Sequence, residues 1–281
     1  MREPEREPAT GTATLAAELS ASPALTAESA LAIVGAGRVG GSLAAAAVAS
    51  GVPTRLAGRA DAVEACRASE VALLCVPDEA IAETAATLAA ADPGLHLVGH
   101  SSGATALTAL APLVESGAAA FSLHPLQTVP DRDTDLSGCP AAIAGSTPEA
   151  LGYARELAVQ LRMQPFEVAE EHRAAYHAAA SIASNFLVAL EQSAAELLSS
   201  VGVADARKLL TPLVLRTAAN WSEHGTAALT GPIARGDEVT VARHLQALRE
   251  TAPELSELYE VLAGRTRALA DRGSRSAAGQ R

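Results

Sequence analysis

An apolar strand that ends in a glycine-spaced turn is the feature that most constrains this chain. In the run LAIVGAGRVGGSLA, residues 31–44, a short apolar stretch leads into Gly35, Gly37 and Gly40, and an alanine-rich helix former follows. Gly35 permits a tight bend, Gly37 lets the backbone approach a pyrophosphate, and Gly40 lets the helix pack close to the strand. The pattern predicts a dinucleotide-binding turn with the phosphates at the helix N-terminus. Glycine-rich turns also occur for packing reasons alone, and that alternative stays open.

The end of the second strand decides which dinucleotide is expected. NAD-binding turns are followed, about 20 residues on, by an Asp or Glu that accepts the ribose 2′-OH. The segment VPTRLAGRAD, residues 52–61, instead places Arg59 just after a strand that ends near Ala57. A guanidinium makes forked hydrogen bonds to phosphate, which favours NADP(H). Arg59 can also be a solvated loop residue, and Asp61 would support NAD if the strand ran longer. The predicted cofactor-binding residues are Gly35, Ala36, Gly37, Arg38, Val39, Gly40, Arg59, Val76 and Pro77.

Length and composition set limits on fold and partners. A chain of 281 residues with 49% hydrophobic residues is globular and long enough for two domains. The net charge of −11 and the scarcity of aromatic residues argue against a nucleic-acid partner, so we expect a small-molecule substrate. No apolar run approaches the roughly 18 residues of a membrane span, and the N-terminal sequence MREPEREPAT lacks a targeting pattern. We therefore expect a cytoplasmic protein with no membrane partner. The three cysteines are widely spaced, and no metal site is predicted.

Short apolar runs alternate with alanine-rich helical stretches from Leu31 onward, which predicts an α/β, doubly wound, Rossmann-like parallel sheet followed by an all-helical C-terminal domain. The expected divisions are a flexible tail over 1–28, the dinucleotide-binding domain over 29–168, a helical substrate and dimerisation domain over 169–272, and a flexible tail over 273–281. The predicted strands are 31–34, 54–57, 71–76, 95–99, 118–123, 141–144 and 165–168, and the predicted helices between them are 40–50, 61–66, 80–90, 104–115 and 148–161.

Residues 170–201 are predicted to form one long helix, with further helices at 203–223, 238–249 and 251–271. At 1.5 Å per residue the first would be roughly 45 Å long. A helix of that length cannot bury itself against a small sheet alone. We therefore expect a homodimer through the helical domain.

Ligands of open parallel sheets bind beyond the carboxyl ends of the strands, so polar residues after each strand are the first candidates for chemistry. Asp78 follows the third strand and is expected to cap the next helix. Ser101 and Ser102 follow the fourth, and Gln127 lies just past the fifth; all three are predicted to contact substrate. His124 is the predicted catalytic proton donor, because the unperturbed pKa of imidazole suits neutral pH. A histidine that merely hydrogen-bonds a loop is the alternative.

The long helix carries a second group of polar residues, namely Tyr176, His177, Ser181, Ser184 and Asn185. His177, Ser181 and Asn185 are four residues apart and share one helix face. His177 and Asn185 are predicted to be catalytic and Ser181 to bind substrate; interhelical hydrogen bonds are the alternative. In the loop GPIARGD, residues 231–237, Asp237 can cap the helix that follows. Arg235 then remains to bind a substrate carboxylate, or else to form an exposed ion pair.

The segments GAGRVG, VALLCVPDEAI, HSSGA, LHPLQT, YHAAASIASNFLVAL and GPIARGD occur in this order over residues 31–270. With them the chain resembles a family of oxidoreductases that join a Rossmann-like half to a helical domain of unknown function. The family is similar to the 6-phosphogluconate-dehydrogenase-like assemblage, which includes ketopantoate reductases, pyrroline-carboxylate reductases and prephenate dehydrogenases. Some members of the family with the domain of unknown function resemble an alternative class of ketopantoate reductase. The resemblance implies NADPH-dependent reduction of ketopantoate for pantothenate synthesis, with His124 and Asn185 at the substrate. One departure is large: ordinary ketopantoate reductases use a lysine on the long helix, and the single lysine here, Lys208, lies beyond it.

Three hypotheses follow from the sequence. The first is an NADPH-dependent reductase of a small 2-oxo acid. The second keeps the fold but reduces an imine, as pyrroline-carboxylate reductases do, so that the missing lysine matters less. The third is a non-catalytic NADP-binding sensor or interaction protein.

Overall fold

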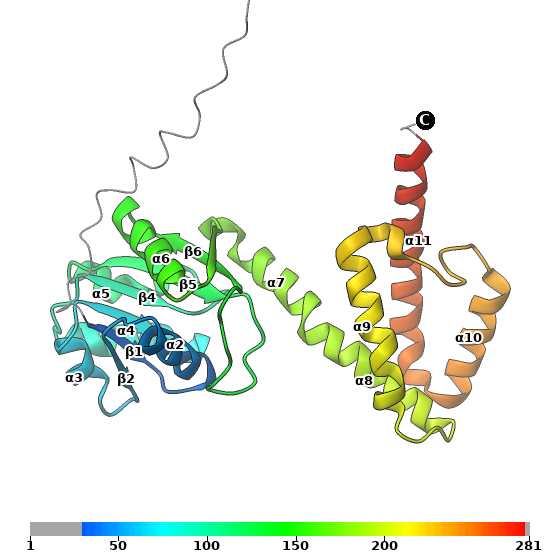
Figure 1. Ribbon diagram of the computed structural model, residues 1–281, viewed down its shortest axis with the longest axis horizontal. Helices are drawn as coiled ribbons and strands as arrows, with labels where there is room; N and C mark the ends of the chain where they lie inside the picture. Colours follow the sequence, from blue (N-terminus) through cyan, green and yellow to red (C-terminus); the bar gives the residue numbers. More distant parts are fainter. Residues whose placement is uncertain (1–29, 279–281) are drawn as a thin grey trace, which may run out of the picture. The chain divides into compact units, whose positions relative to one another are not determined.

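The computed structural model describes residues 30–278 of the chain, with side chains over residues 30–272. The chain divides into two compact units, the first ending at Ser181 and the second beginning at Ile182 (Figure 1). Among the described helices, none combines the length and hydropathy that a membrane span requires. The predicted N-terminal tail, residues 1–28, lies outside the described residues.

A seven-stranded sheet forms the centre of the first unit, in the order β2-β1-β3-β4-β5-β6-β7. Its strands are β1 (Leu31–Val34), β2 (Thr54–Ala57), β3 (Val71–Leu74), β4 (Leu97–His100), β5 (Ala119–Pro125), β6 (Pro140–Gly145) and β7 (Gln164–Glu167). Strands β1, β3 and β4 are buried along their whole length, as expected for apolar strands covered on both faces. All seven predicted strands are confirmed, with ends that shift by a few residues.

Helices cover both faces of this sheet. They are α2 (Arg38–Ala49), α3 (Ala62–Arg67), α4 (Asp78–Ala90), η1 (Leu107–Leu110), α5 (Ala111–Glu115) and α6 (Pro148–Gln160). Leu43 of α2 and Leu157 of α6 belong to one buried cluster, whereas Ile81 of α4 and Leu113 of α5 belong to the other. The doubly wound α/β architecture is therefore confirmed.

One strand pairing differs from the prediction of a parallel sheet. Strands β1 to β5 are parallel, but β6 runs antiparallel to β5, and β7 is parallel to β6. The cause lies in the connection. Residues 126–139 between β5 and β6 contain no helix, and without a crossover helix a chain returns most readily in the opposite direction.

The second unit is helical. After η2 (Glu170–His172), α7 (Arg173–Ala183) leaves the sheet, and α8 (Asn185–Ser200), α9 (Ala206–His224), η3 (Gly225–Ala228), α10 (Glu238–Thr251), η4 (Pro253–Leu255) and α11 (Ser256–Ala278) follow. Asp237 caps α10 as predicted, accepting a hydrogen bond from the Thr240 amide at 3.1 Å. Helix α11 continues to Ala278, past residue 273 where the C-terminal tail was predicted to begin. Residues 279–281 lie outside the described part.

The single long helix predicted over 170–201 is wrong. The segment from Glu170 begins with a 3₁₀ turn, and its helix is interrupted at Ser184, whose φ of −119° departs from helical values. Serine and asparagine side chains compete for backbone hydrogen bonds, which makes the Ser184–Asn185 step a natural point of interruption.

Two local predictions near the sheet edge are also wrong. Asp78 is the first residue of α4 rather than its cap; Pro77 occupies the cap position. The helix predicted from residue 104 begins only at Leu107, because the Ser102 hydroxyl accepts hydrogen bonds from the amides of Ala104 and Thr105 and holds them in a turn.

Candidate active site

The glycine turn after β1 is as tight as its sequence predicts. Gly35 has a φ of +117°, and a Cβ on it would lie 2.3 Å from the carbonyl oxygen of Cys75. A Cβ on Gly40 would lie 1.9 Å from the carbonyl oxygen of Gly35. Gly37 differs, because a Cβ on it would meet no atom within 4 Å. Gly35 and Gly40 are therefore required for packing, while Gly37 borders open space.

That open space lies at the N-terminus of α2. Gly37 is the cap residue and offers no side-chain hydrogen bond, and the first turn of α2 contains no acidic residue. The first amide groups of such a helix have no internal partner, and the helix dipole adds a partial positive charge. Gly37 and Arg38 are both exposed. The turn, with Ala36 and Val39 beside it, fits the pyrophosphate of a dinucleotide.

The neighbouring strand ends are held beside this turn. The Gly35 amide donates to the Ala57 carbonyl at 2.8 Å, which fixes the end of β2 there. Arg59 follows two residues later and is exposed, and its role in binding a 2′-phosphate stays a prediction. Because β2 ends at Ala57, Asp61 does not stand at the strand end, and the alternative that depended on a longer strand loses its basis. On the other side, Val76 and Pro77 connect β3 to α4 next to Gly35.

His124 lies further along the same sheet edge, near the end of β5. Its Nδ1 is 2.7 Å from the Tyr176 hydroxyl of α7, and the His124 ring lies 6.0 Å from the ring of His177. Gly103, in the loop after β4, makes room for both imidazoles: a Cβ there would lie 2.7 Å from Cδ2 of His177 and 2.9 Å from Nε2 of His124. Three segments that are distant in sequence therefore meet at His124.

A buried arginine fixes the start of α7 against the sheet. Arg173 is 2% exposed. Its Nη1 donates to the Ser122 hydroxyl at 2.7 Å and lies 3.4 Å from Oε1 of Glu170, and its Nη2 donates to the Ser102 carbonyl. The other carboxylate oxygen of Glu170 accepts a hydrogen bond from the Leu107 amide at 2.7 Å. The Arg173 charge is thus paired and hydrogen-bonded, as a buried charge must be.

Burial also sets the protonation states here. Desolvation lowers the pKa of His124 to about 4, and the proximity of His177 and the charge of Arg173 act in the same direction. Desolvation raises the pKa of Tyr176 to about 12, although Arg173 opposes that shift. At neutral pH both side chains are therefore uncharged. The prediction that His124 has an ordinary imidazole pKa is wrong, because the prediction took no account of burial.

His100, at the end of β4, is a second buried imidazole. It is 0% exposed, and neither ring nitrogen has a hydrogen-bond partner among the described residues. Desolvation and the charge of Arg173 lower its pKa to about 4, while Asp78 acts in the opposite direction. His100 is consequently neutral in the folded protein.

The remaining predicted substrate residues are dispersed. Ser101 donates weakly to the Leu74 carbonyl at 3.5 Å, and the Ser102 hydroxyl shapes its own loop. Gln127 is exposed and accepts from the Thr128 amide at 3.1 Å. Ser181 lies at the end of the first unit.

Asn185 and Arg235 belong to the helical unit. The interruption at Ser184 separates Asn185 from the helix that carries His177, so the predicted continuous stripe does not form. Arg235 is exposed, and no described carboxylate lies within ion-pair distance of it. The exposed ion pair considered for Arg235 is therefore absent from the described residues.

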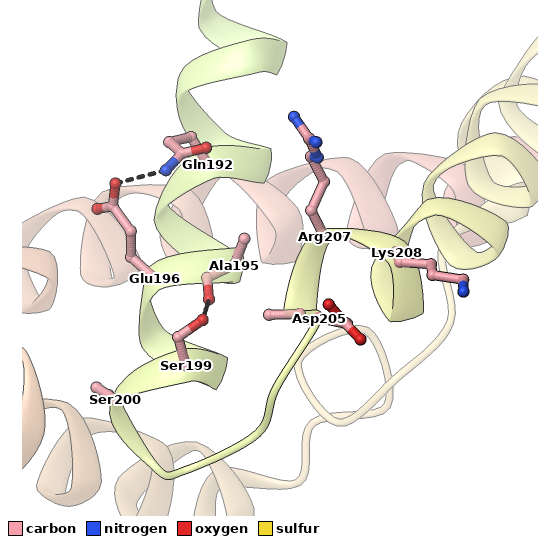
Figure 2. Close-up of a pocket in the computed structure, with 9 residues that line it drawn as sticks. Gln192, Ala195, Glu196, Ser199, Ser200, Asp205, Arg207 and Lys208 are labelled. Atoms are coloured by element: carbon pink, nitrogen blue, oxygen red, sulfur yellow. Dashed lines mark hydrogen bonds between the residues drawn. The ribbon is translucent and has the colours of Figure 1, made fainter.

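The helical unit has a pocket of its own, with a volume of about 700 Å³ between α8 and α9 (Figure 2). Glu196, Asp205, Arg207 and Lys208 contribute charged groups to its lining. Figure 2 shows the Lys208 side chain pointing away from α8. None of the predicted site residues lines this pocket. Over the described residues, no group of three or more His, Cys, Asp or Glu side chains is placed to hold a metal ion.

Reasoning from the sequence missed two residues that build the site around His124, Arg173 and Glu170, and it named Tyr176 only as a polar group of the long helix, without a role. A signal was present. Ser122 and His124 lie two apart on a strand and so share one face, while Arg173, Tyr176 and His177 share one face of a helix. Matching these two polar faces would have paired β5 with α7.

Comparisons with known proteins agree with this architecture. Residues 53–125 match the model of a Rossmann-like domain, and residues 139–266 match a domain of unknown function (DUF2520). No curated protein matches the sequence.

Solved structures with the same fold cover most of the chain. A Bacteroides fragilis protein provisionally described as an NADP oxidoreductase superposes with a TM-score of 0.69 at 23% identity, covering 86% of this chain and 99% of its own. Protein TM1727 of Thermotoga maritima superposes with a TM-score of 0.69 at 22% identity, covering 87% of this chain and 99% of its own. An imine reductase of Streptomyces aurantiacus superposes with a TM-score of 0.63 at 14% identity, covering 86% of this chain and 98% of its own. The chain thus combines a Rossmann-like domain with a helical C-terminal region that matches the DUF2520 model.

Proposed function

We propose that the protein is an NADPH-dependent oxidoreductase that reduces the carbonyl group of a small 2-oxo acid, with ketopantoate as the first substrate to test. The observation that carries the proposal is the hydrogen bond between His124 and Tyr176. It lies at the carboxyl ends of the parallel strands β1 to β5, on the same edge of the sheet as a glycine turn that is open to a phosphate, and ligands of this fold bind at that edge.

Cofactor binding is assigned to the turn and its neighbours. The amides that follow Gly37 would hold the pyrophosphate, and Arg59 would hold the 2′-phosphate that distinguishes NADPH from NADH. The solved structures of this fold include an Aspergillus terreus reductive aminase in complex with NADPH, which supports the choice.

Bound NADPH would supply a hydride to the carbonyl carbon. His124, neutral at pH 7, would then donate its Nε2 proton to the oxygen, and Nδ1 would take a proton from the Tyr176 hydroxyl. Water would reprotonate Tyr176, so that one hydride and one proton convert the carbonyl to an alcohol. A neutral imidazole suits this role because one ring nitrogen donates a hydrogen bond while the other accepts one, so Nε2 can give up a proton as Nδ1 receives one. His177 would orient the substrate beside Gly103.

The substrate's carboxylate needs a cation that is not already engaged. Arg173 is buried, and its two Nη atoms already bond to Ser122, Glu170 and the Ser102 carbonyl, so we assign the carboxylate to Arg235. Ser101, Gln127, Ser181 and Asn185 are proposed as polar contacts. We also propose a homodimer through the helical unit. Its exposed apolar side chains include Val188 at 68%, Leu213 at 63% and Trp221 at 66%, and a partner would cover such side chains.

Imine reduction is the second candidate. A protonated imine arrives with its own proton, so it needs no acid with a pKa near neutrality, and the low pKa of His124 favours such a substrate. The absence of lysine from α7 and α8 also favours an imine substrate.

One experiment separates these functions. NADPH oxidation is followed with a panel of 2-oxo acids, including ketopantoate, and a panel of cyclic imines, with NADH as the control cofactor. Turnover of 2-oxo acids supports the first candidate, and turnover of imines alone supports the second. NADPH binding without turnover of any substrate would instead indicate a sensor.

A further inference from the structure

The loop between β5 and β6, residues 126–139, folds onto the first turns of α2 (Figure 1). The Ser42 hydroxyl donates to the Asp131 carbonyl at 3.2 Å. A Cβ on Gly41 would lie 2.8 Å from Cβ and 3.0 Å from Cγ of Arg132, so the arginine stem rests directly on that glycine. The second glycine of the pair at 40–41 is thereby explained: it makes room for Arg132.

The loop is held in place along its length. Oδ1 of Asp131 accepts from the Asp133 amide at 3.1 Å and from the Thr134 hydroxyl at 3.0 Å. Leu136, 1% exposed, anchors the loop in the core. The Gly138 amide donates to the Arg162 carbonyl at 2.7 Å. The stem of Arg132 therefore starts from a fixed backbone.

The guanidinium of Arg132 has no bonding partner among the described residues. Arg132 is exposed, and over the described side chains it forms no hydrogen bond or ion pair. The Asp131 carboxylate is engaged within its own turn. A cation beside the positive end of a helix that has no acid in its first turn is unfavourable unless an anion is present.

We propose that Arg132 is a ligand of the cofactor's pyrophosphate, reaching over the N-terminus of α2 from the loop that follows His124. The inference rests on the proposed function. At a rise of 1.5 Å per residue, the amide of Arg38 lies roughly 5 Å along the helix axis from Gly41, within reach of an extended arginine. The pyrophosphate is favoured over the 2′-phosphate because the glycine turn places the former at this helix end.

Direct binding measurements test the assignment. NADPH and NADH are titrated separately into the full-length protein and into Arg132→Gln, with Arg132→Lys as the conservative variant and Asp133→Asn as a charge control in the same loop. Thermal unfolding checks that each variant is folded; Arg132 is exposed, so we expect little change. The dissociation constants of both nucleotides should rise about tenfold in Arg132→Gln and less in Arg132→Lys. They should not rise in Asp133→Asn.

Three results would count against the assignment or its basis. Unchanged binding of both nucleotides in Arg132→Gln overturns the proposal. A loss confined to NADPH would mean that Arg132 holds the 2′-phosphate, and it overturns the pyrophosphate assignment. If the unsubstituted protein binds neither nucleotide, the proposed function itself fails, and this outcome is distinct from the other two.

Discussion

The hydroxyl of Tyr176 lies 2.7 Å from Nδ1 of His124 and so links α7 to the end of β5. The same two elements are joined by Arg173 and Ser122, one helical turn and two strand residues away. A polar face of the strand is thus matched by a polar face of the helix, within a buried environment that keeps both His124 and Tyr176 neutral.

Replacing Tyr176 with Phe removes the proton that Nδ1 of His124 would receive. We expect kcat to fall by roughly 100-fold on the substrate found by the panel, because general acid catalysis contributes factors of this size. The dissociation constant of NADPH should not change. Tyr259→Phe is the matched control, since Tyr259 makes a similar 2.8 Å contact with His244 in the helical unit. An unchanged kcat in Tyr176→Phe would remove Tyr176 from the mechanism.

Arg173→Met leaves the polar groups around it without their donor. The free energy of unfolding should fall by about 3–5 kcal/mol, the range for breaking a buried ion pair. Arg155→Met, which breaks an exposed pair with Glu167, should cost less than about 1 kcal/mol. Urea denaturation of both variants provides the comparison. Equal losses would mean that Arg173 does not anchor α7.

Two glycine substitutions in one turn should have opposite consequences. Gly37→Ala introduces a Cβ into open space, so we expect normal thermal stability but weakened NADPH binding, because the methyl group occupies the approach to the α2 amides. Gly40→Ala forces a Cβ against the Gly35 carbonyl and should lower the melting temperature sharply. Thermal unfolding combined with nucleotide titration measures both effects. NADPH affinity that survives in a stable Gly37→Ala protein would contradict the pyrophosphate position.

Stability should depend on pH through the buried imidazoles. The pKa values of His100 and His124 are lowered from 6.5 to about 4 in the folded protein, so between these values the unfolded chain binds more protons. The free energy of unfolding is then largest above about pH 6.5 and is lost as the pH falls toward about 4.

The slope has an upper limit of roughly 1.4 kcal/mol per pH unit for each histidine. Urea denaturation across this range measures it, and His124→Gln should have a smaller slope than the unsubstituted protein. The difference between the two slopes removes the contribution of the carboxylates, which titrate in the same pH range in both proteins. Identical slopes would show that His124 has no lowered pKa.

Much of the fold could be predicted from the sequence because burial leaves a local pattern. The apolar runs at β1 and β3 and the glycine spacing at residues 35–40 each encode their structure in a few neighbouring residues. The antiparallel β6 could not be predicted in the same way, since its direction depends on how residues 126–139 return across the sheet.

The site was harder to predict, because its members meet only through tertiary contacts. His124 was predicted from its place after a strand, but the burial that lowers its pKa comes from α7 and the Gly103 loop. No pattern in the residues around Arg173 indicates that its side chain is buried. Only its position opposite Ser122 shows that it is buried. Side chains that work through distant partners carry little local signal.

The most direct test compares His124→Ala with the unsubstituted protein, measuring the NADPH dissociation constant and the single-turnover rate of NADPH oxidation in the same samples. We predict that NADPH affinity is unchanged and that the rate falls by roughly 100-fold or more. A variant that oxidises NADPH as fast as the unsubstituted protein would contradict the role of His124 as proton donor.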